Sequence, residues 1–164
     1  MSYKNYITEV PDFPIEGVSF KDISPLLANQ KLFEECIDEM GLLVDMPDYW
    51  IGIDARGFIF ASALSMIHGG GVVMCRKKGK LPPPTASHKY KTEYSEDELE
   101  IKIGTGSVVV VDDVLATGGT LEATNYLVKT AGYDVIDNLV LIDLKYVPRV
   151  EDFNLEVRSL ISYE

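Results

Sequence analysis

Two side chains that could do chemistry stand next to each other in the stretch VVVVDDVLATGGT, which spans residues 108–120. Asp112 and Asp113 follow four valines, and such a run is typical of a buried strand in a parallel sheet. In open α/β sheets, ligands bind beyond the carboxyl ends of the strands. We therefore expect both carboxylates to face a crevice, where they can accept hydrogen bonds from the hydroxyl groups of a ligand.

The next residues favour the binding of a phosphate group. They are Ala116, Thr117, Gly118, Gly119 and Thr120. Small residues let backbone N–H groups crowd into one concavity, and a helix that starts there adds a dipole that favours an anion. A Gly-Gly turn or an acidic helix cap is by itself an ordinary structural feature. Together, the carboxylates and this loop predict a site for a ribose phosphate.

Composition limits what else the chain can be. It has 164 residues, of which 46% are hydrophobic, which fits one domain with an ordinary core. The formal net charge of −11 disfavours nucleic acid and anionic membranes as partners, so an anionic ligand needs a local basic cluster. Four of the 15 Lys and Arg residues lie within residues 76–80, RKKGK. This run predicts such a cluster, with a solvated basic turn as the alternative.

The chain shows no targeting or membrane signal. No apolar run approaches the ~20 residues of a membrane span, and the first ten residues lack the apolar centre of a secretory signal. Cys36 and Cys75 lie in apolar segments without the spacing of a zinc or redox motif. We expect buried thiols and a cytoplasmic protein.

Short β-branched runs alternate with runs of helical period, which predicts an α/β fold with a central, mostly parallel sheet flanked by helices. We expect helices over 30–44, 57–70 and 119–132, and strands over 49–54, 71–76, 107–113 and 135–144. The helix over 57–70 is so apolar that we expect it to be buried nearly all round.

Residues 77–106 break this alternation. They contain three consecutive prolines and then a polar stretch in which Tyr90, Thr92 and Tyr94 alternate with charged residues, as in a two-stranded flap. A long excursion from a compact domain is a lid or a disordered insert. We expect a lid over about 77–106.

The stretch at 108–120 resembles the signature of the type I phosphoribosyltransferases, which bind phosphoribosyl pyrophosphate. Over nearly its whole length, the chain is similar to the adenine-specific members of that family. The blocks that carry this resemblance are DFPIEGVSFKDISPLL (12–27), GIDARGFIF (52–60), RKKGKLP (76–82) and EYSEDELEI (93–101). The segment before Asp12 and the turn KIGTGS are short for the family. Ala61 replaces a usual glycine, and Ser19 a usual valine or leucine at the base.

The resemblance implies the fold and the reaction. The fold would be a single type I phosphoribosyltransferase domain over 1–164, with a small N-terminal hood over about 1–28 and a flexible lid hairpin. The reaction would transfer the 5-phosphoribosyl group from phosphoribosyl pyrophosphate to adenine, giving AMP and pyrophosphate. Mg²⁺ as cofactor and a homodimer are further implications.

Three alternatives stay open from the residues alone. The acceptor could be another purine such as hypoxanthine or xanthine. A non-enzymatic regulator could use the same pocket, although a DNA-binding extension finds no room in an acidic single domain. A phospho-acceptor receiver domain also carries paired aspartates at a strand end, but on its first strand, whereas this pair comes late and precedes a phosphate loop.

The resemblance also implies roles for single residues. Displacement of pyrophosphate from ribose develops positive charge on the sugar, as in glycoside hydrolysis. The implied catalytic residues are Arg56, Glu93, Asp112 and Asp113, with Glu93 managing a proton on the purine. The implied phosphoribosyl pyrophosphate site consists of Arg56, Arg76, Lys77, Lys80, Tyr94, Asp112, Asp113, Ala116, Thr117, Gly118, Gly119 and Thr120. The implied base site consists of Val18, Ser19, Phe20 and Lys21.

Two further implications concern the metal and the backbone. Mg²⁺ would be held mainly by substrate oxygens, with Asp112 and Asp113 as candidate ligands. Arg56 would bind pyrophosphate at the turn DARG, residues 54–57, where the resemblance implies a cis peptide bond between Asp54 and Ala55.

Overall fold

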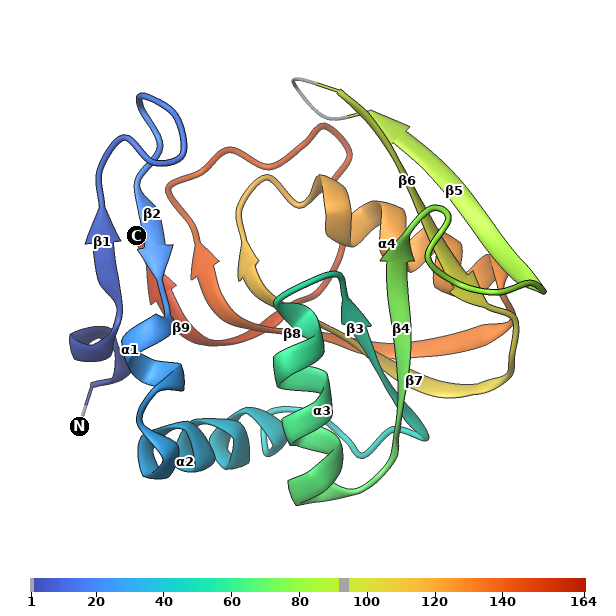
Figure 1. Ribbon diagram of the computed structural model, residues 1–164, viewed down its shortest axis with the longest axis horizontal. Helices are drawn as coiled ribbons and strands as arrows, with labels where there is room; N and C mark the ends of the chain where they lie inside the picture. The colour runs from blue at the N-terminus through green and yellow to red at the C-terminus, as the bar shows by residue number, and fades with distance from the viewer. Residues whose placement is uncertain (1, 92–94) are drawn as a thin grey trace.

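A seven-stranded sheet forms the centre of the molecule, in the order β5-β6-β4-β3-β7-β8-β9 (Figure 1). The computed structural model describes residues 2–91 and 95–164. Strands β4, β3, β7, β8 and β9 run parallel, whereas β6 pairs with β4 and β5 with β6 in antiparallel fashion. The strands are β3 (Tyr49–Ile53), β4 (Gly71–Lys77), β5 (Thr85–Lys91), β6 (Glu96–Lys102), β7 (Gly106–Leu115), β8 (Tyr133–Leu144) and β9 (Arg158–Tyr163). The expected α/β fold with a mostly parallel sheet is confirmed.

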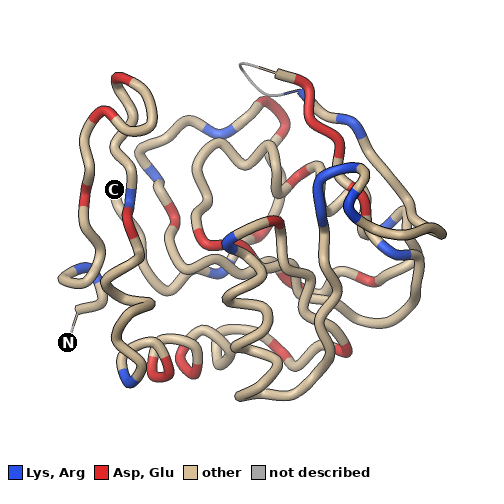
Figure 2. Tube along the Cα trace, viewed as in Figure 1, with Lys and Arg blue, Asp and Glu red and all other residues tan. Residues whose placement is uncertain are grey.

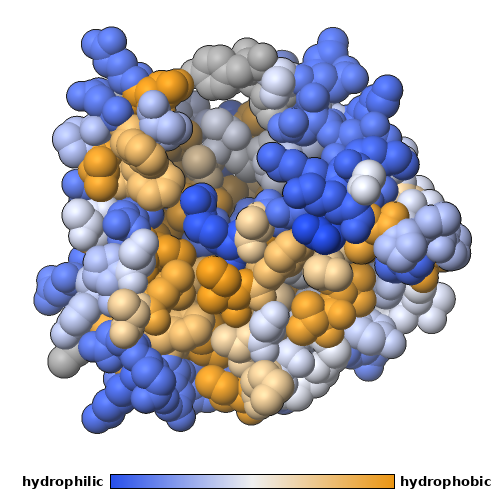
Figure 3. Space-filling view, viewed as in Figure 1, coloured by the Kyte–Doolittle hydropathy of each residue, from blue (hydrophilic) through white to orange (hydrophobic). Residues whose placement is uncertain are grey.

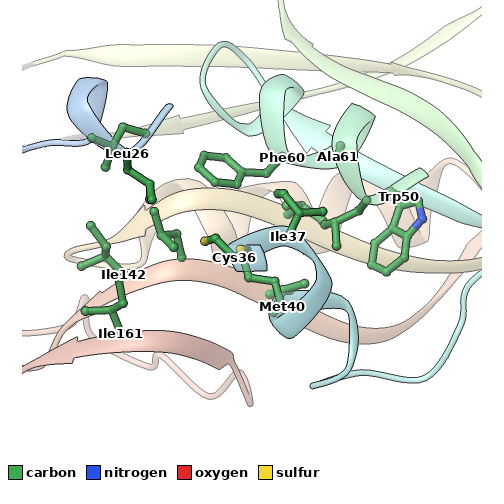
Figure 4. Packing of buried hydrophobic residues seen from close by; sticks show 14 of the residues in the cluster. Leu26, Cys36, Ile37, Met40, Trp50, Phe60, Ala61, Ile142 and Ile161 are labelled. Carbon is green, nitrogen blue, oxygen red and sulfur yellow. The ribbon is translucent and has the colours of Figure 1, made fainter. Parts of the chain in front are cut away.

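Helices cover both faces of the sheet because alternate residues of each strand point to opposite sides. Val109 and Val111 of β7 pack with α2 (Gln30–Gly41) and α3 (Gly57–His68), in a cluster that Figure 4 shows from close by. Val108 and Val110 pack on the other face with α4 (Gly119–Thr130). The four valines are therefore central to two cores, and they fix β7 between them.

The expected helices and strands are present, with two corrections. The helix expected over 30–44 ends at Gly41. Gly41 packs on the end of α3, where a Cβ would come within 2.2 Å of the His68 ring. The helix expected to be buried nearly all round is not: Met66 is 86% exposed, and Ile59 and Ile67 are also exposed. Helix α3 covers the sheet with one face only.

The exposed side of α3 continues into an apolar surface. Val72 and Met74 of β4 are exposed beside it, as are Ile59 and Met66. Figure 3 shows apolar residues gathered on this face of the molecule. We call these four residues and Ile67 the α3–β4 surface.

The expected two-stranded flap is confirmed as the hairpin β5–β6. It extends the main sheet, since Arg76 and Lys77 of β4 pair with Glu100 and Leu99 of β6. The hairpin also lies against α4, where the rings of His88 and Tyr126 are 4.4 Å apart. Thr92 and Tyr94 lie outside the described residues.

The N-terminal segment forms a separate two-stranded sheet of β1 (Thr8–Val10) and β2 (Phe20–Asp22), with the short helices η1 (Tyr3–Tyr6) and α1 (Ser24–Leu27) beside it. Lys21 of β2 is 6% exposed. Its ammonium group lies 2.8 Å from Glu9 and 4.4 Å from the centre of the Tyr163 ring. This buried cation attaches the N-terminal sheet to β9, a strand that the sequence pattern did not predict.

Both cysteines are buried and unpaired, as expected. Burial raises the pKa of the Cys36 thiol and of the Cys75 thiol to about 12. Within residues 2–91 and 95–164, no helix has the length and apolar character needed to cross a membrane.

A buried amide pair joins α4 to β8 and gives the first prediction. Asn125 donates to the side-chain oxygen of Asn138 at 2.6 Å, and Asn138 donates to the carbonyl of Glu156 at 3.2 Å. Asn138→Ala leaves one N–H of the buried Asn125 amide without a partner, while the other keeps the Leu121 carbonyl at 2.9 Å. The loss costs about 1–3 kcal/mol of the free energy of unfolding. Urea denaturation measures this, with the exposed Asn5→Ala as control. Equal stability of the two variants would contradict the prediction.

Candidate active site

The turn between β3 and α3 brings a cation to the acidic pair. Arg56, the residue before α3, donates from Nε to the carboxylate of Asp113. The turn reaches this position because Gly57 lies against β7, where a Cβ would meet the Val111 carbonyl at 2.7 Å. The Arg56 side chain is half-exposed, so the guanidinium remains accessible to a ligand. The expected cis peptide bond between Asp54 and Ala55 is confirmed.

Both aspartates lie within β7 and not beyond its end, because the strand continues to Leu115. Asp113 is 4% exposed. Burial and the neighbouring charge of Asp113 together raise the pKa of Asp112, whose Oδ1 accepts a hydrogen bond from the Asp113 backbone N–H at 2.9 Å. Both carboxylates line a hollow of about 400 Å³, together with Ala55, Arg56 and Thr120.

Residues 116–120, here called the phosphate loop, form a second hollow beside the first. This hollow of about 110 Å³ is lined by the whole loop and by Asp112. Gly118 has φ +86°, a left-handed conformation that favours glycine, and α4 starts directly after it. The backbone N–H groups of Thr117, Gly118 and Thr120 have no hydrogen-bond partner within the described part of the chain. Free donors at a helix N-terminus suit an anion.

Two carboxylates hold the basic run at 76–80 in place, Asp54 of the turn and Glu100 of β6. Asp54 lies 3.5 Å from Arg76 and accepts from the Lys77 backbone N–H at 3.4 Å. Glu100 accepts from the backbone N–H groups of Lys80 and Leu81 at 2.8 and 2.7 Å. Figure 2 shows these lysines as a blue cluster at the end of β4. The run therefore belongs to the same edge of the sheet as the acidic pair.

Glu100 is ionised in this position although it is 2% exposed. Burial works against the charged form, but the backbone N–H groups of Leu81, Gly79 and Lys80, with the nearby Lys78, hold the pKa of Glu100 below its usual value. The charged carboxylate fixes the shape of the basic run.

Of the four residues expected at the base, Phe20 lies beside Arg56. Its ring centre lies 5.4 Å from the Arg56 guanidinium. Val18 is exposed, and Ser19 Oγ lies 3.4 Å from Lys21 Nζ. The Lys21 side chain turns away, toward Glu9 and the C-terminal strand.

Two expected residues, Glu93 and Tyr94, lie outside the described residues. The hairpin that carries them does reach the phosphate loop, since Tyr90 Oη lies 3.3 Å from Thr120 Oγ1.

The segment after β8 contributes residues that the sequence reasoning missed. Val150 donates its backbone N–H to the Thr117 carbonyl at 2.8 Å, and the Arg149 guanidinium donates to the Ala116 carbonyl. The Phe153 ring packs so closely on Gly118 that a Cβ at residue 118 would lie 2.4 Å from a carbon of the ring. A single arginine and a single phenylalanine in a polar connection carry no periodicity or motif, so no sequence pattern could identify them.

Comparison with known proteins agrees with this geometry. Residues 22–155 match the family described as the phosphoribosyl transferase domain, which is the class that the fold and site indicate. The chain is 44% identical to the adenine phosphoribosyltransferase of Hydrogenovibrio crunogenus over 165 aligned residues, which cover 97% of this chain and 95% of that protein.

Solved structures give the same result. The crystal structure of adenine phosphoribosyltransferase from Thermoanaerobacter pseudethanolicus matches with a TM-score of 0.90 and 38% identity, covering 98% of each chain. The enzyme of that name from Saccharomyces cerevisiae, in complex with an imino-altritol bisphosphate and adenine, matches with a TM-score of 0.86 and 31% identity, covering 96% of this chain and 98% of that one. The chain therefore belongs to the phosphoribosyltransferases and, within them, to the adenine phosphoribosyltransferase family.

The raised pKa of Asp112 gives the second prediction. A folded-state pKa above the unfolded one means that ionisation of Asp112 destabilises the native state, with no penalty below the unfolded pKa and the full penalty above the folded pKa. Asp112→Asn removes this penalty and should therefore raise Tm at about pH 8, by roughly 2–4 °C for each kcal/mol gained in the free energy of unfolding. The rise in Tm should vanish toward about pH 4.

Thermal unfolding in magnesium-free buffer measures this gain. The exposed Asp134→Asn serves as the matched control, and its Tm should stay close to that of the unmodified protein. An Asp112→Asn variant that is no more stable than the unmodified protein at about pH 8 contradicts the assignment of a buried charge.

Proposed function

We propose that this protein transfers the 5-phosphoribosyl group of phosphoribosyl pyrophosphate to adenine, giving AMP and pyrophosphate. The observation that carries the proposal is the meeting of three segments at one edge of the sheet: the turn 54–57, the acidic pair and the phosphate loop, which together line two adjoining hollows. One chain thus offers cations, carboxylates and free N–H groups side by side.

Each part of the substrate has a suitable counterpart. The 5-phosphate binds the free N–H groups and hydroxyls of residues 116–120, at the N-terminus of α4. The ribose hydroxyls donate to the carboxylates of Asp112 and Asp113. These carboxylates line the same hollow as Arg56. The pyrophosphate binds Arg56 and the basic run, with Arg76, Lys77 and Lys80 as its cations.

The residues also suit the chemistry of the transfer. The bond between the anomeric carbon and pyrophosphate breaks as the base attacks, and positive charge develops on the ribose. The carboxylates of Asp112 and Asp113 stabilise that charge, and Arg56 stabilises the negative charge on the departing pyrophosphate. The half-exposed guanidinium can do so while its Nε remains on Asp113.

The site fits Mg²⁺ that is held mainly by the substrate. No group of three or more His, Cys, Asp or Glu side chains able to hold a metal occurs in residues 2–91 and 95–164. Asp112 and Asp113 offer oxygen ligands, and Mg²⁺ commonly combines one or two carboxylates with substrate phosphates and water. A Mg²⁺ ion bound there would supply positive charge to the leaving pyrophosphate.

The proposed base site lies in the N-terminal segment, over Val18, Ser19, Phe20 and Lys21. The Phe20 ring beside Arg56 offers an aromatic face next to the leaving-group side. The yeast relative was solved with adenine, which favours adenine over hypoxanthine or xanthine. Glu93 manages a proton on the purine and Tyr94 covers the reacting groups, while the hairpin β5–β6 acts as the lid.

Assembly and location complete the proposal. The α3–β4 surface exposes five large apolar side chains, which is typical of a surface that another chain covers. We infer that the protein is a homodimer through this surface. Two buried free thiols fit a reducing compartment, so the proposed location is the cytoplasm.

The third prediction tests the reaction. The protein mixed with Mg²⁺, phosphoribosyl pyrophosphate and adenine should form AMP and pyrophosphate, and hypoxanthine or xanthine should react at least about a hundredfold more slowly. Chromatography of the nucleotides measures both products. Faster formation of IMP or XMP would show that hypoxanthine or xanthine is the preferred substrate, and not adenine. Substrate binding without turnover of any purine would indicate a regulator.

The fourth prediction concerns Arg56. Arg56→Lys keeps the charge but loses the planar set of donors, so kcat/KM for phosphoribosyl pyrophosphate should fall by roughly tenfold to a thousandfold. Arg158→Lys is the control, because Arg158 also pairs with an aspartate, Asp137 at 3.4 Å, at the far side of the sheet. Equal activity of the two variants would exclude Arg56 as the group that holds pyrophosphate.

A further inference from the structure

The outer side of the phosphate loop is held by the segment that follows β8. Arg149 donates to the carbonyls of Ala116, Leu144 and Val147, the latter two at 3.0 and 3.3 Å. Its other terminal nitrogen pairs with the carboxylate of Asp143 on β8. One side chain thus connects the loop to the end of the neighbouring strand.

These contacts fix the direction of the loop's peptide groups. In a trans peptide, the carbonyl of one residue and the N–H of the next point in opposite directions. None of the cis bonds in the described chain lies in this loop. Because Arg149 holds the Ala116 carbonyl on the outer side, the Thr117 N–H must point to the opposite side, where the hollow lies.

The next peptide is held in the same way. The Thr117 carbonyl accepts from the Val150 backbone N–H at 2.8 Å, which turns the Gly118 N–H away from that segment. The N–H groups of Thr117 and Gly118 have no partner among residues 2–91 and 95–164. Two free donors are therefore aimed in advance by residues that bind the carbonyls behind them.

Arg149 itself stays outside the hollow. The residues that line this hollow are 112, 114–121 and 140, and Arg149 is not among them. Arg149 instead lines a separate hollow of about 250 Å³, together with Tyr90, Thr117, Gly119 and Thr120. Its side chain and that of Asp143 are 23% and 16% exposed, so both are held in place. The guanidinium also lies 5.8 Å from the Phe153 ring, which packs on Gly118.

We propose that Arg149 is a positioning residue for the phosphate site: anchored by Asp143, it orients the phosphate loop so that its N–H groups are aimed at the 5-phosphate before the substrate arrives. The inference rests on the proposed function, which places that phosphate on the loop. Arginine suits the role because its planar guanidinium places Nη1 on the carbonyls and Nη2 on the Asp143 carboxylate at the same time. The single nitrogen of a lysine ammonium cannot reproduce this fixed two-nitrogen geometry.

The test compares two ligands that bind at different parts of the proposed site. Ribose 5-phosphate carries the phosphate that the loop would hold, whereas pyrophosphate with Mg²⁺ would bind at Arg56 and the basic run. Calorimetric titration of Arg149→Gln should show a Kd for ribose 5-phosphate that is roughly tenfold to a hundredfold higher, because the loss of charge-assisted hydrogen bonds frees the loop. The Kd for pyrophosphate should change less than about twofold.

Two further variants make the result specific. Arg149→Lys should restore only part of the affinity for ribose 5-phosphate. Arg158→Gln removes a comparable arginine and aspartate pair, Arg158 with Asp137, without any contact to the loop, so both Kd values should stay unchanged. If Arg149→Gln does not fold, Asp143→Asn replaces it, with a smaller rise in the Kd for ribose 5-phosphate alone.

The outcomes separate this inference from the proposed function. Unchanged affinity of folded Arg149→Gln for ribose 5-phosphate overturns the role of Arg149, and so does an equal loss for both ligands, which would indicate general disruption. Failure of the unmodified protein to bind ribose 5-phosphate or to form AMP instead overturns the proposed function.

Discussion

The ion pair between Arg56 and Asp113 is the constraint on which the site depends. Asp113 is almost fully buried at the end of the central strand, and a carboxylate at that depth is costly unless a cation pairs with it. The cation comes from the turn after β3, the strand that neighbours β7, and the turn comes close enough because residue 57 has no side chain. The order of the strands, Gly57 and Arg56 are therefore all needed to pair the buried Asp113 with a cation.

An acidic protein that binds a highly charged anion must collect its positive groups locally. Here they come from three separate segments: the turn that carries Arg56, the basic run after β4 and the N-terminus of α4. Carboxylates hold two of these in place, since Asp113 binds Arg56 and Glu100 binds the backbone of the basic run. Local geometry thus overrides the net charge of −11, which acts only at longer range through a salt-screened field.

Sequence patterns predicted the parts of the fold that have a period or a motif. The four valines, the helix at 119–130 and the turn at 54–57 were readable because burial, small loop residues and a familiar order of blocks leave a local signature. Two kinds of feature were not readable. The exposed side of α3 was predicted to be buried because a helix that is apolar on all sides gives no indication of which side faces the sheet.

The support of the phosphate loop was missed for a different reason. Arg149 and Phe153 act through contacts with residues more than thirty positions away, and the contact with Gly118 depends on shape alone. Such complementarity exists only once the strands are placed side by side. The same holds for Lys21, whose side chain joins the N-terminal sheet to β9 through contacts that the sequence did not predict.

The guanidinium of Arg56 contacts both the acidic pair and Phe20 of the proposed base site. Its Nε is taken by Asp113, which leaves the two terminal nitrogens as a planar pair of donors for a pyrophosphate. Phe20 lies against this guanidinium and so restricts the directions in which that plane can turn. Phe20 belongs to β2, and β2 is held on β9 by the buried Lys21. The docking of the N-terminal segment therefore restricts the orientation of the guanidinium that we propose binds the leaving pyrophosphate. In this way the proposed base site and the proposed pyrophosphate site are coupled without any direct contact between the two ligands.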